Sequence, residues 1–348
     1  MPEKIPVYSA EKDELEKLCA IKEKYRTSQI CGWLFKKKVI SFAQMSNVPK
    51  NILTALEEHF TIHTLTPLAD ADSSRTETFR EAFRTADGKI IEAVFMNTGK
   101  NRTACLSSQS GCPLACSFCA SGSSMSFGRS LAAHEIIEQF ILLNRKVPEG
   151  AQNIVFMGMG EPFLNQDEVF RALRIFLDAD KFAIAPKRIT VSTAGIPKGI
   201  ADLAGIFPKV NLAVSLHSAL QPLRDELMPG LKKIPLSELR RAVFQHINNT
   251  ELAVTIEYLM LDKINDSPAH AEALAAFCRG MNCIINLIPF NRYPGCSYQP
   301  SSRSAVRFFQ ETLEKKNLEV VQRFRRGDDI NAACGQLGAF DCKTSEYQ

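Results

Sequence analysis

Short apolar runs alternate with longer amphipathic segments over most of this chain, from Lys89 to Val321. Between the runs, apolar residues recur at helical spacing, as in Ile136–Ile141. This alternation predicts βα units and a mostly parallel sheet, arranged as an open sheet or a partial barrel. In both arrangements ligands gather at the carboxyl ends of the strands. The predicted strands are Ile90–Phe95, Ala104–Ser108, Ile154–Met157, Ile189–Ser192, Val210–Leu216, Val254–Leu259, Ile284–Ile288 and Leu318–Val321.

The first 75 residues follow a different pattern. Apolar residues recur there at helical spacing in two stretches, Leu15–Ile21 and Ile52–Phe60. The segment Asp70–Arg75 is polar and lacks periodicity, as expected of a linker. We therefore expect two domains, a small helical N-terminal domain of residues 1–75 and an α/β domain of residues 76–348.

Charge and hydropathy restrict the partners and the cellular location that we expect for the chain. Its 348 residues, 45% of them hydrophobic, can bury a substantial core. A formal net charge of +4, from 42 basic and 38 acidic residues, neither requires nor excludes a nucleic-acid partner. Met1–Asp13 lacks the apolar core of a signal peptide, and no apolar run approaches the roughly 20 residues that span a bilayer. We expect a cytoplasmic protein without membrane contact.

Three of the 11 cysteines, Cys112, Cys116 and Cys119, lie on one short segment. A disulfide framework is not expected in the reducing cytoplasm, so clustered thiols indicate metal or redox chemistry. A [4Fe–4S] cluster takes one thiolate per iron, and three cysteines therefore leave one iron open to bind a substrate or cofactor. The alternatives are a zinc site completed by Cys105 or His134 and a fully ligated electron-transfer cluster. Neither is favoured, because the chain has no second CxxC pair.

The spacing of this triad, with Phe118 directly before the third cysteine, resembles the signature of the radical S-adenosylmethionine (SAM) superfamily. The resemblance implies that the open iron binds the amino and carboxylate groups of SAM. An electron from the cluster then cleaves a carbon–sulfur bond of SAM and gives a 5′-deoxyadenosyl radical. The part of the protein is to aim that radical.

Small and polar residues follow four of the predicted strands. Glycines in the Gly158–Glu161 turn allow the backbone to approach a ligand, and Glu161 can accept a hydrogen bond from an ammonium group. His217 has two equally weighted interpretations, a catalytic base and a hydrogen-bonded structural residue. Because strand ends meet at one edge of the sheet, these segments can line one pocket. The residues expected to bind the cofactor are Gly160, Glu161, Ser192, Ser215, Leu216, His217 and Asn291.

Two further cysteines, Cys105 and Cys334, lie far apart in the sequence, and taken singly each is interpreted as a buried thiol. Together with the triad they resemble the RlmN and Cfr family of radical SAM RNA methyltransferases. The similarity extends from about Tyr25 to Leu337. The segments that carry it are Trp33–Lys38, Gln109–Cys119, Gly158–Asn165, Ser215–His217, Glu257–Asp266 and Gly327–Leu337.

The resemblance implies a mechanism that consumes two SAM molecules per turnover. One SAM methylates Cys334, and the second supplies the radical that removes hydrogen from that methyl group. The resulting methylene radical adds to a ring carbon of adenine and links the RNA to Cys334. Glu92 matches the family's acceptor of the ring proton, and Cys105 attacks the Cys334 sulfur to form a transient disulfide. Cellular reductants can reset such a disulfide.

The resemblance also implies a radical SAM partial (β/α) barrel, an N-terminal RNA-binding domain and an electron donor such as flavodoxin. The implied substrate is an adenosine of 23S rRNA, together with an adenosine in a tRNA anticodon loop. Lys36–Lys38 and the basic residues Arg323, Arg325 and Arg326 are then expected to contact phosphates. The alternative interpretation of Trp33–Lys38 is a helix end with a solvated face.

Two alternatives remain open within this reasoning. RlmN-type enzymes modify carbon 2 of adenine and Cfr-type enzymes modify carbon 8, and the shared cysteines do not separate them. Gly160–Pro162 and Trp33–Lys38 look more similar to the RlmN type, so carbon 2 is favoured. An alternative of another class is a non-catalytic RNA-binding protein with a structural zinc ion.

Overall fold

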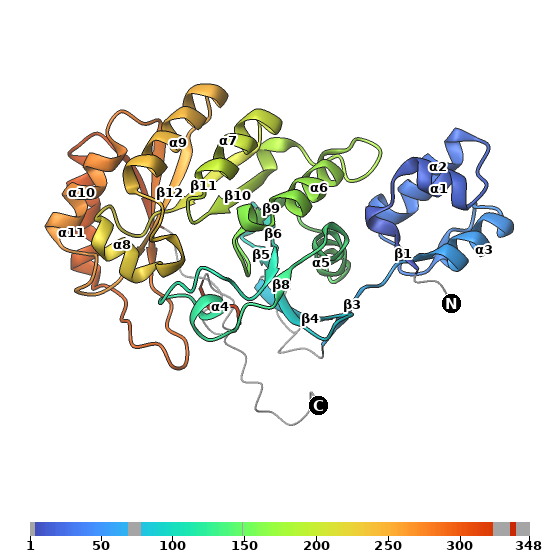
Figure 1. Cartoon of the computed structure of the whole chain (residues 1–348), viewed down its shortest axis with the longest axis horizontal. Coiled ribbons are helices and arrows are strands. Elements are labelled where there is room, and N and C mark those ends of the chain that lie inside the picture. Colours follow the sequence, from blue (N-terminus) through green and yellow to red (C-terminus); the bar gives the residue numbers. More distant parts are fainter. Residues whose placement is uncertain (1–3, 69–77, 148, 323–334, 339–348) are drawn as a thin grey trace.

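A ten-stranded sheet organises the larger part of the molecule, and its strands follow the order β14-β13-β12-β11-β10-β9-β6-β5-β4-β3 (Figure 1). The computed structural model describes residues 4–68, 78–147, 149–322 and 335–338. The ten strands are β3 (Leu65–Pro67), β4 (Thr78–Thr85), β5 (Ile90–Asn97), β6 (Arg102–Cys105), β9 (Asn153–Phe156), β10 (Ile189–Thr193), β11 (Asn211–Ser215), β12 (Val254–Met260), β13 (Cys283–Pro289) and β14 (Glu319–Gln322).

Every pairing from β6 through β14 is parallel. Parallel neighbours need long crossovers, and helices supply them here. The helices are α5 (Ala133–Arg145), α6 (Gln166–Leu177), α7 (Pro197–Ile206), α8 (Gln221–Leu227), α9 (Leu236–Thr250), α10 (Pro268–Cys278) and α11 (Arg303–Glu314). Within the described residues, β14 and β3 are the two edges of the sheet and do not pair with each other. The predicted α/β fold is confirmed as a partial barrel.

Each of the eight predicted strands overlaps a strand of the sheet, but β3 and β4 were not predicted. They pair antiparallel beside β5 and extend the sheet. Along β4 the buried positions alternate, yet Glu81 occupies one of them and obscures the apolar pattern. Lys146 lies 2.6 Å from the Glu81 carboxylate and compensates this buried charge. The extension also brings Arg80 of β4 to 3.5 Å from the carboxylate of Glu92 on β5.

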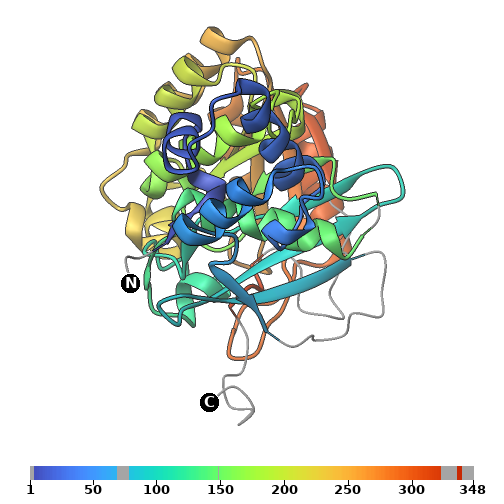
Figure 2. The ribbon, with the colours of Figure 1, turned by 90° about the vertical axis from the view of Figure 1, so that its right-hand side faces the viewer.

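The N-terminal segment forms a small helical unit on one side of the sheet (Figure 2). Its helices are α1 (Lys12–Leu18), α2 (Lys24–Cys31) and α3 (Lys50–His59), so both predicted helical stretches are present. The second one ends earlier than expected, because Phe60 pairs with Ile5 as part of β2 (Phe60–Thr61) and β1 (Ile5–Pro6). The core of this unit is continuous with that of the sheet, through edge contacts of Phe35 with Tyr8 and Phe182. The expected linker Asp70–Arg75 lies outside the described residues.

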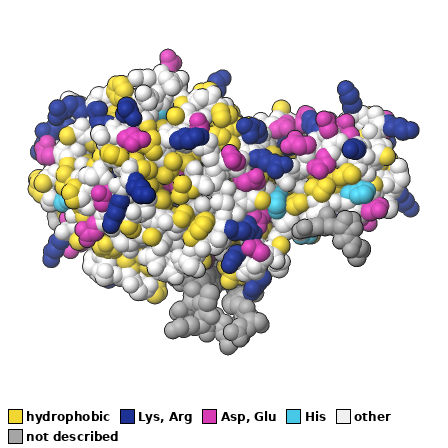
Figure 3. Space-filling model, in the orientation of Figure 1, with side chains coloured by type: hydrophobic (Ala, Val, Ile, Leu, Met, Phe, Trp, Pro, Cys, Tyr) yellow, Lys and Arg dark blue, Asp and Glu magenta, His cyan; other side chains and the backbone are white. Residues whose placement is uncertain are grey.

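The segment Trp33–Lys38 lies at a helix end, as the alternative interpretation of this segment predicts. Gly32–Lys36 forms one turn of π-helix that buries Leu34 and Phe35. Lys36 and Lys37 are exposed, and the Lys37 ammonium lies 3.4 Å from the centre of the Trp33 ring. Basic and acidic side chains are interspersed over the visible face of the molecule, in keeping with its nearly balanced charge (Figure 3). In the described part of the chain, no helix combines the length and apolarity needed to cross a membrane.

One buried carboxylate ties the helical unit to the sheet. Glu138 of α5 is 1% exposed and accepts hydrogen bonds from the Thr64 amide, the Thr64 hydroxyl and the Leu65 amide at 2.8, 2.7 and 3.1 Å. His63 Nδ1 lies 3.2 Å from its other oxygen, and this contact raises the pKa of His63. Glu138 therefore satisfies the backbone at the start of β3.

We expect Glu138→Ala to lower the free energy of unfolding by about 3 kcal/mol, because the substitution leaves several buried donors without an acceptor. Equilibrium urea denaturation measures the change. The control is Lys198→Ala, which removes an exposed ion pair with Asp202 and should have little effect. Equal effects of the two substitutions would contradict the role given to Glu138.

Candidate active site

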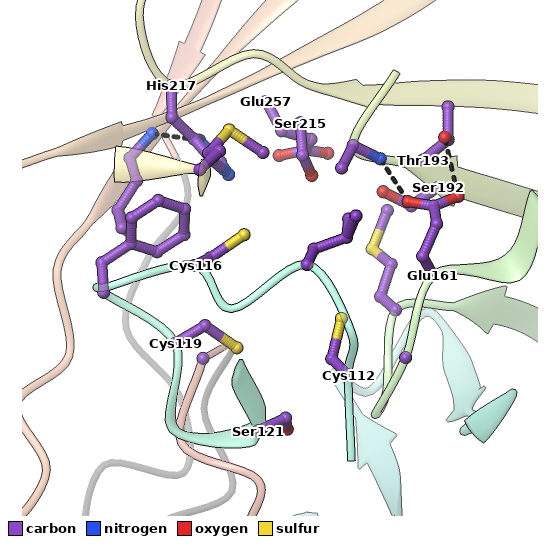
Figure 4. Close-up of a pocket in the computed structure, with 18 of the residues that line it drawn as sticks. Cys112, Cys116, Cys119, Ser121, Glu161, Ser192, Thr193, Ser215, His217 and Glu257 are labelled. Atoms are coloured by element: carbon purple, nitrogen blue, oxygen red, sulfur yellow. Dashed lines mark hydrogen bonds between the residues drawn. The ribbon is translucent and has the colours of Figure 1, made fainter. Parts of the chain in front are cut away.

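A cavity of about 990 Å³, counted with the solvent at its mouth, lies at the carboxyl ends of the parallel strands (Figure 4). The segment of the cysteine triad covers one side of the cavity, and the ends of β9 through β13 form the other. Eight of the residues predicted from the sequence line it together: Cys112, Cys116, Cys119, Gly160, Glu161, Ser192, Ser215 and His217.

The three thiols lie around one space on the loop that precedes α4 (Ala120–Ser123) (Figure 4). The loop turns tightly, since the Cys119 amide donates to the Cys116 carbonyl at 3.1 Å. Burial raises the pKa of Cys112 to about 12 and that of Cys116 well above its usual value. The neighbouring thiols add to the shift at Cys116, as expected of ligands gathered for one group. Binding iron therefore requires that the thiols release protons.

The segment Leu227–Gly230 is hydrogen-bonded to the cysteine loop. The Ser117 amide donates to the Leu227 carbonyl at 3.0 Å, and the Gly230 amide donates to the Leu114 carbonyl at 3.0 Å. Leu227 ends α8, and Gly230 lies in the short 3₁₀ helix Pro229–Leu231. Two backbone hydrogen bonds thus fix the cysteine loop against α8.

The donor set fits an iron–sulfur cluster better than zinc. A closed zinc site needs four ligands that converge on one ion, whereas a [4Fe–4S] cluster takes its thiolates on separate irons. Neither Cys105 nor His134 lines the cavity. In the described ranges, no group of three or more His, Cys, Asp or Glu side chains converges as a single-ion site would require. Three thiols around an open cavity match the arrangement that leaves one iron accessible.

Gly160 allows the turn after β9 to approach the wall of the cavity. Its φ is +99°, and a Cβ there would lie 2.5 Å from Cβ of Gln109. The same Gln109 accepts a hydrogen bond from the Glu161 amide at 2.9 Å through its side-chain oxygen. A side chain at position 160 is therefore excluded by both backbone conformation and space.

Glu161 is buried and its carboxylate is firmly held. One oxygen accepts hydrogen bonds from the Phe163 amide and the Thr193 hydroxyl at 3.0 and 2.8 Å, and the other accepts from the Ala194 amide at 2.6 Å. Burial raises the pKa of Glu161, and these donors oppose the shift. A carboxylate oxygen has two lone pairs, so the oxygen bound to Ala194 can accept one more donor. The predicted contact with an ammonium group is compatible with this geometry.

His217 is placed as a structural residue rather than as a base. Its Nδ1 accepts a hydrogen bond from the Leu259 amide at 3.1 Å, so the neutral ring carries its proton on Nε2. The ring of Phe118 packs edge-on against it at 4.8 Å. Burial, aided by the Arg224 cation, lowers the pKa of His217 to about 3. A histidine that remains neutral at physiological pH, with Nδ1 occupied, offers the cavity a donor.

Two residues predicted to bind the cofactor do not line the cavity, and two residues that were not predicted do line it. Leu216 and Asn291 are buried but do not line the cavity. Thr193 and Glu257, which were not predicted, do line it. Glu257 lies on β12, and its carboxylate accepts a hydrogen bond from the Asn286 side chain at 2.7 Å. The available signal was an acidic residue inside the otherwise apolar run Val254–Leu259.

The segment Gly335–Gly338 is bound directly to the helix that follows the triad. The Ala120 amide donates to the Gly335 carbonyl at 2.8 Å, and the Ser121 hydroxyl donates to the Leu337 carbonyl at 2.6 Å. Gly335 and Leu337 both line the cavity. Cys334 lies outside the described residues, as do Arg323, Arg325 and Arg326. The residue that follows Cys334 in the sequence is thus part of the cavity wall.

Cys105 and Glu92 also contact the segment Gly335–Gly338. Cys105, at the end of β6, is buried in a small cluster with Val94, Met159 and Leu337. The Gly338 amide donates to the Glu92 carboxylate at 2.8 Å. Burial raises the pKa of Glu92, whereas Arg80, at 3.5 Å, lowers it. A carboxylate whose pKa is raised in this way is suited to accept a proton.

Comparison with known proteins gives consistent matches over nearly the whole chain. Residues 9–62 match the Ribosomal RNA large subunit methyltransferase N-terminal domain, and residues 106–274 match the Radical SAM superfamily. The dual-specificity RNA methyltransferase RlmN of Geobacter sulfurreducens is 42% identical, with 93% of this chain and 89% of that relative covered. The corresponding enzyme of Halorhodospira halophila is 41% identical, with 90% and 88% covered.

A solved structure agrees with these matches. The crystal structure of a radical SAM methyltransferase from Sphaerobacter thermophilus superposes with a TM-score of 0.92 at 37% sequence identity. The superposition covers 97% of this chain and 100% of that one. The sheet and the N-terminal unit are therefore a shared architecture.

We expect Cys116→Ser to abolish retention of the iron–sulfur cluster, because two thiols do not replace the three that surround the cavity. Anaerobic purification followed by iron and sulfide analysis measures the loss. The matched control is Cys296→Ser, since Cys296 does not line the cavity and its removal should leave the iron content unchanged. Full iron and sulfide in the Cys116 variant would exclude this thiol as a ligand.

Proposed function

This chain belongs to the RlmN family of radical SAM RNA methyltransferases, and we propose that it methylates carbon 2 of an adenosine in 23S rRNA and in a tRNA anticodon loop. One observation carries the proposal. The cysteine loop, the strand ends, Cys105 with Glu92, and the segment after Cys334 come together at one cavity and its wall. The contacts of Cys105 and Glu92 with the segment after Cys334 thus support the proposal of thiol-mediated methyl transfer.

The cavity has the groups needed to hold both cofactors of the proposed reaction. Cys112, Cys116 and Cys119 would hold a [4Fe–4S] cluster through three of its irons. Glu161 and the hydroxyls at the strand ends would orient SAM against the fourth. When bound, the cluster and SAM supply the electron and the 5′-deoxyadenosyl radical that start the reaction. The apolar parts of the wall, such as Phe118, exclude water from that radical.

In the proposed sequence, Cys334 first receives a methyl group from one SAM, which leaves as S-adenosylhomocysteine. The 5′-deoxyadenosyl radical from the second SAM would take one hydrogen atom from that methyl group, the methylene carbon would bond to the adenine ring, and the remaining unpaired electron would return to the cluster. Glu92 accepts the proton that leaves the ring carbon. The Cys105 thiolate then attacks the Cys334 sulfur, so a sulfur–sulfur bond forms while the bond between that sulfur and the methylene carbon breaks. The released methylene carbon takes up a proton and becomes the methyl group, and the methylated adenine leaves. Cellular thiols supply the two electrons that reduce the disulfide. The contacts of Leu337 and Gly338 with Cys105 and Glu92 support this arrangement.

Residues 1–75 are proposed as the RNA-binding domain, with catalysis assigned to residues 76–348. The exposed Lys36 and Lys37 can contact phosphates without loss of packing, because Leu34 and Phe35 hold their backbone. We place the reaction in the cytoplasm, where RNA and reducing thiols occur together. A flavodoxin-type protein is the proposed electron donor.

Methylation of carbon 8 of adenine, by the same mechanism, is the alternative to methylation of carbon 2. The shared cysteines serve both reactions, so the assignment to carbon 2 rests on membership in the RlmN family. The described residues do not support the alternative of a non-catalytic zinc protein, since neither Cys105 nor His134 lines the cavity with the triad.

We expect Cys105→Ala to trap a covalent complex between enzyme and RNA, because the second sulfur is needed to release the product. Cys334→Ala should instead form no complex, because no thiol receives the methyl group. Denaturing gels of turnover mixtures with labelled RNA distinguish the two results. A Cys105 variant that turns over without a crosslink would contradict the resolving role.

Nucleoside mass spectrometry tests the position of the new methyl group. RNA from a strain that lacks this protein should gain 2-methyladenosine when it is incubated with the enzyme, SAM and a reductant. Because rRNA and tRNA are analysed separately, each proposed substrate is tested independently. The appearance of 8-methyladenosine would contradict the assignment to carbon 2.

A further inference from the structure

Arg224 is a fully buried cation behind the wall of the cavity. It lies in α8, with an exposed fraction of 0%. Its Nη2 donates to the Ala194 carbonyl at 2.5 Å, but Nε and Nη1 have no hydrogen-bond partner in the parts of the chain that the structure describes. Arginine is almost never fully buried unless it is paired. A guanidinium with unused donors at this depth therefore indicates a partner that is not part of the described protein.

The groups around Arg224 locate that partner. A Cβ on Gly195 would lie 3.1 Å from Nη2, so the guanidinium is packed against the end of β10. The titratable groups that act on it or respond to it are Cys116, His217 and Asp225. His217 is neutral, and the Asp225 carboxylate accepts a hydrogen bond from the Gln221 side chain at 2.7 Å. Cys116 and His217 both line the cavity, and since His217 is neutral, Cys116 is the lining residue that can carry negative charge near Arg224.

Arg224 stays charged in this setting. Burial lowers its pKa to about 10, which still leaves the guanidinium protonated at neutral pH. A cation buried without a paired anion is costly, because little surrounding solvent stabilises it. The cost is offset when negative charge enters the neighbouring cavity.

The cofactor of the proposed function brings such a charge. A [4Fe–4S] cluster held by three thiolates is negatively charged, and it becomes more so when it accepts an electron. In a site of low dielectric constant, a nearby cation stabilises the reduced cluster more than the oxidised one. Reduction potentials of these clusters depend on local charge and on solvent exposure.

We propose that Arg224 is a positioning residue that provides the counter-charge of the cluster and raises its reduction potential. This inference rests on the proposed function. The same guanidinium holds the Ala194 carbonyl, and the Ala194 amide donates to Glu161 at 2.6 Å. Arg224 is therefore connected, through Ala194, to the carboxylate that is proposed to bind SAM. The step it favours is a one-electron reduction, with the electron taken from a low-potential donor.

The first test compares Arg224→Met, which keeps an apolar stem but removes the charge, with Arg224→Lys, which keeps the charge. The variants are loaded anaerobically with iron and sulfide. They are then titrated with dithionite and redox mediators while the paramagnetic resonance of the reduced cluster is recorded. We expect the Met variant to have a more negative midpoint potential than the native protein and the Lys variant to stay close to it.

A matched control separates charge at the cluster from the general loss of an arginine. Arg240 also donates to backbone carbonyls, those of Phe277 and Arg279 at the end of α10, and it does not line the cavity. Arg240→Met should leave the midpoint potential unchanged. Equal potentials of the Arg224→Met variant and the native protein, or equal shifts for Met and Lys at position 224, would overturn the proposal.

A second measurement covers the case in which Arg224 only supports the fold. In the protein without its cluster, Arg224→Met should unfold at the same or a higher temperature, because an unpaired buried cation has been removed. Loading the cluster should then raise the melting temperature less than in the native protein. A marked loss of stability without the cluster would assign Arg224 to the bond with Ala194 alone. Failure of the native protein to bind a cluster would contradict the proposed function instead.

Discussion

The parallel register of the central strands is the constraint on which the site depends. In that register Ser215 of β11 pairs with Glu257 of β12, and Glu257 pairs with Asn286 of β13. Three polar residues from segments far apart in the sequence thus form a row across the sheet near its carboxyl edge. A slip of one residue would turn each side chain to the opposite face and break the row. The helices fix the register by covering apolar strands that are buried on both sides.

The site is also buried, and burial strengthens each polar contact in it. Glu161 is buried, yet three donors hold its carboxylate in one orientation. Arg224 is buried with a single bond to Ala194 among the described residues, so its charge is largely uncompensated. Polar groups in such surroundings interact more strongly than they would in water. The cavity is therefore prepared for a ligand that bears an ammonium group on one side and negative charge on the other.

What the sequence predicts well here is local. The apolar runs identify eight strands, and the three cysteines and the glycine turn identify parts of both sides of the cavity, since each lies within a few consecutive residues. Contacts across the sheet escape such reasoning. Glu257 was missed because its role depends on the pairing with neighbouring strands, and β4 was missed because Glu81 interrupts its apolar face. Arg224 resembles a solvent-facing residue of an amphipathic helix until its burial is known.

The segment after Cys334 helps to bury Cys105. Cys105 packs against Met159 and Leu337, so external oxidants reach the free thiol poorly. A thiol that must attack one particular sulfur benefits from this protection, provided that the sulfur is delivered from inside. The hydrogen bonds of Gly335 and Leu337 to α4, and of Gly338 to Glu92, hold the adjoining chain in the same wall. The proposed pairing of Cys105 with Cys334 would thus use a thiol of low solvent accessibility that packs against the segment following Cys334.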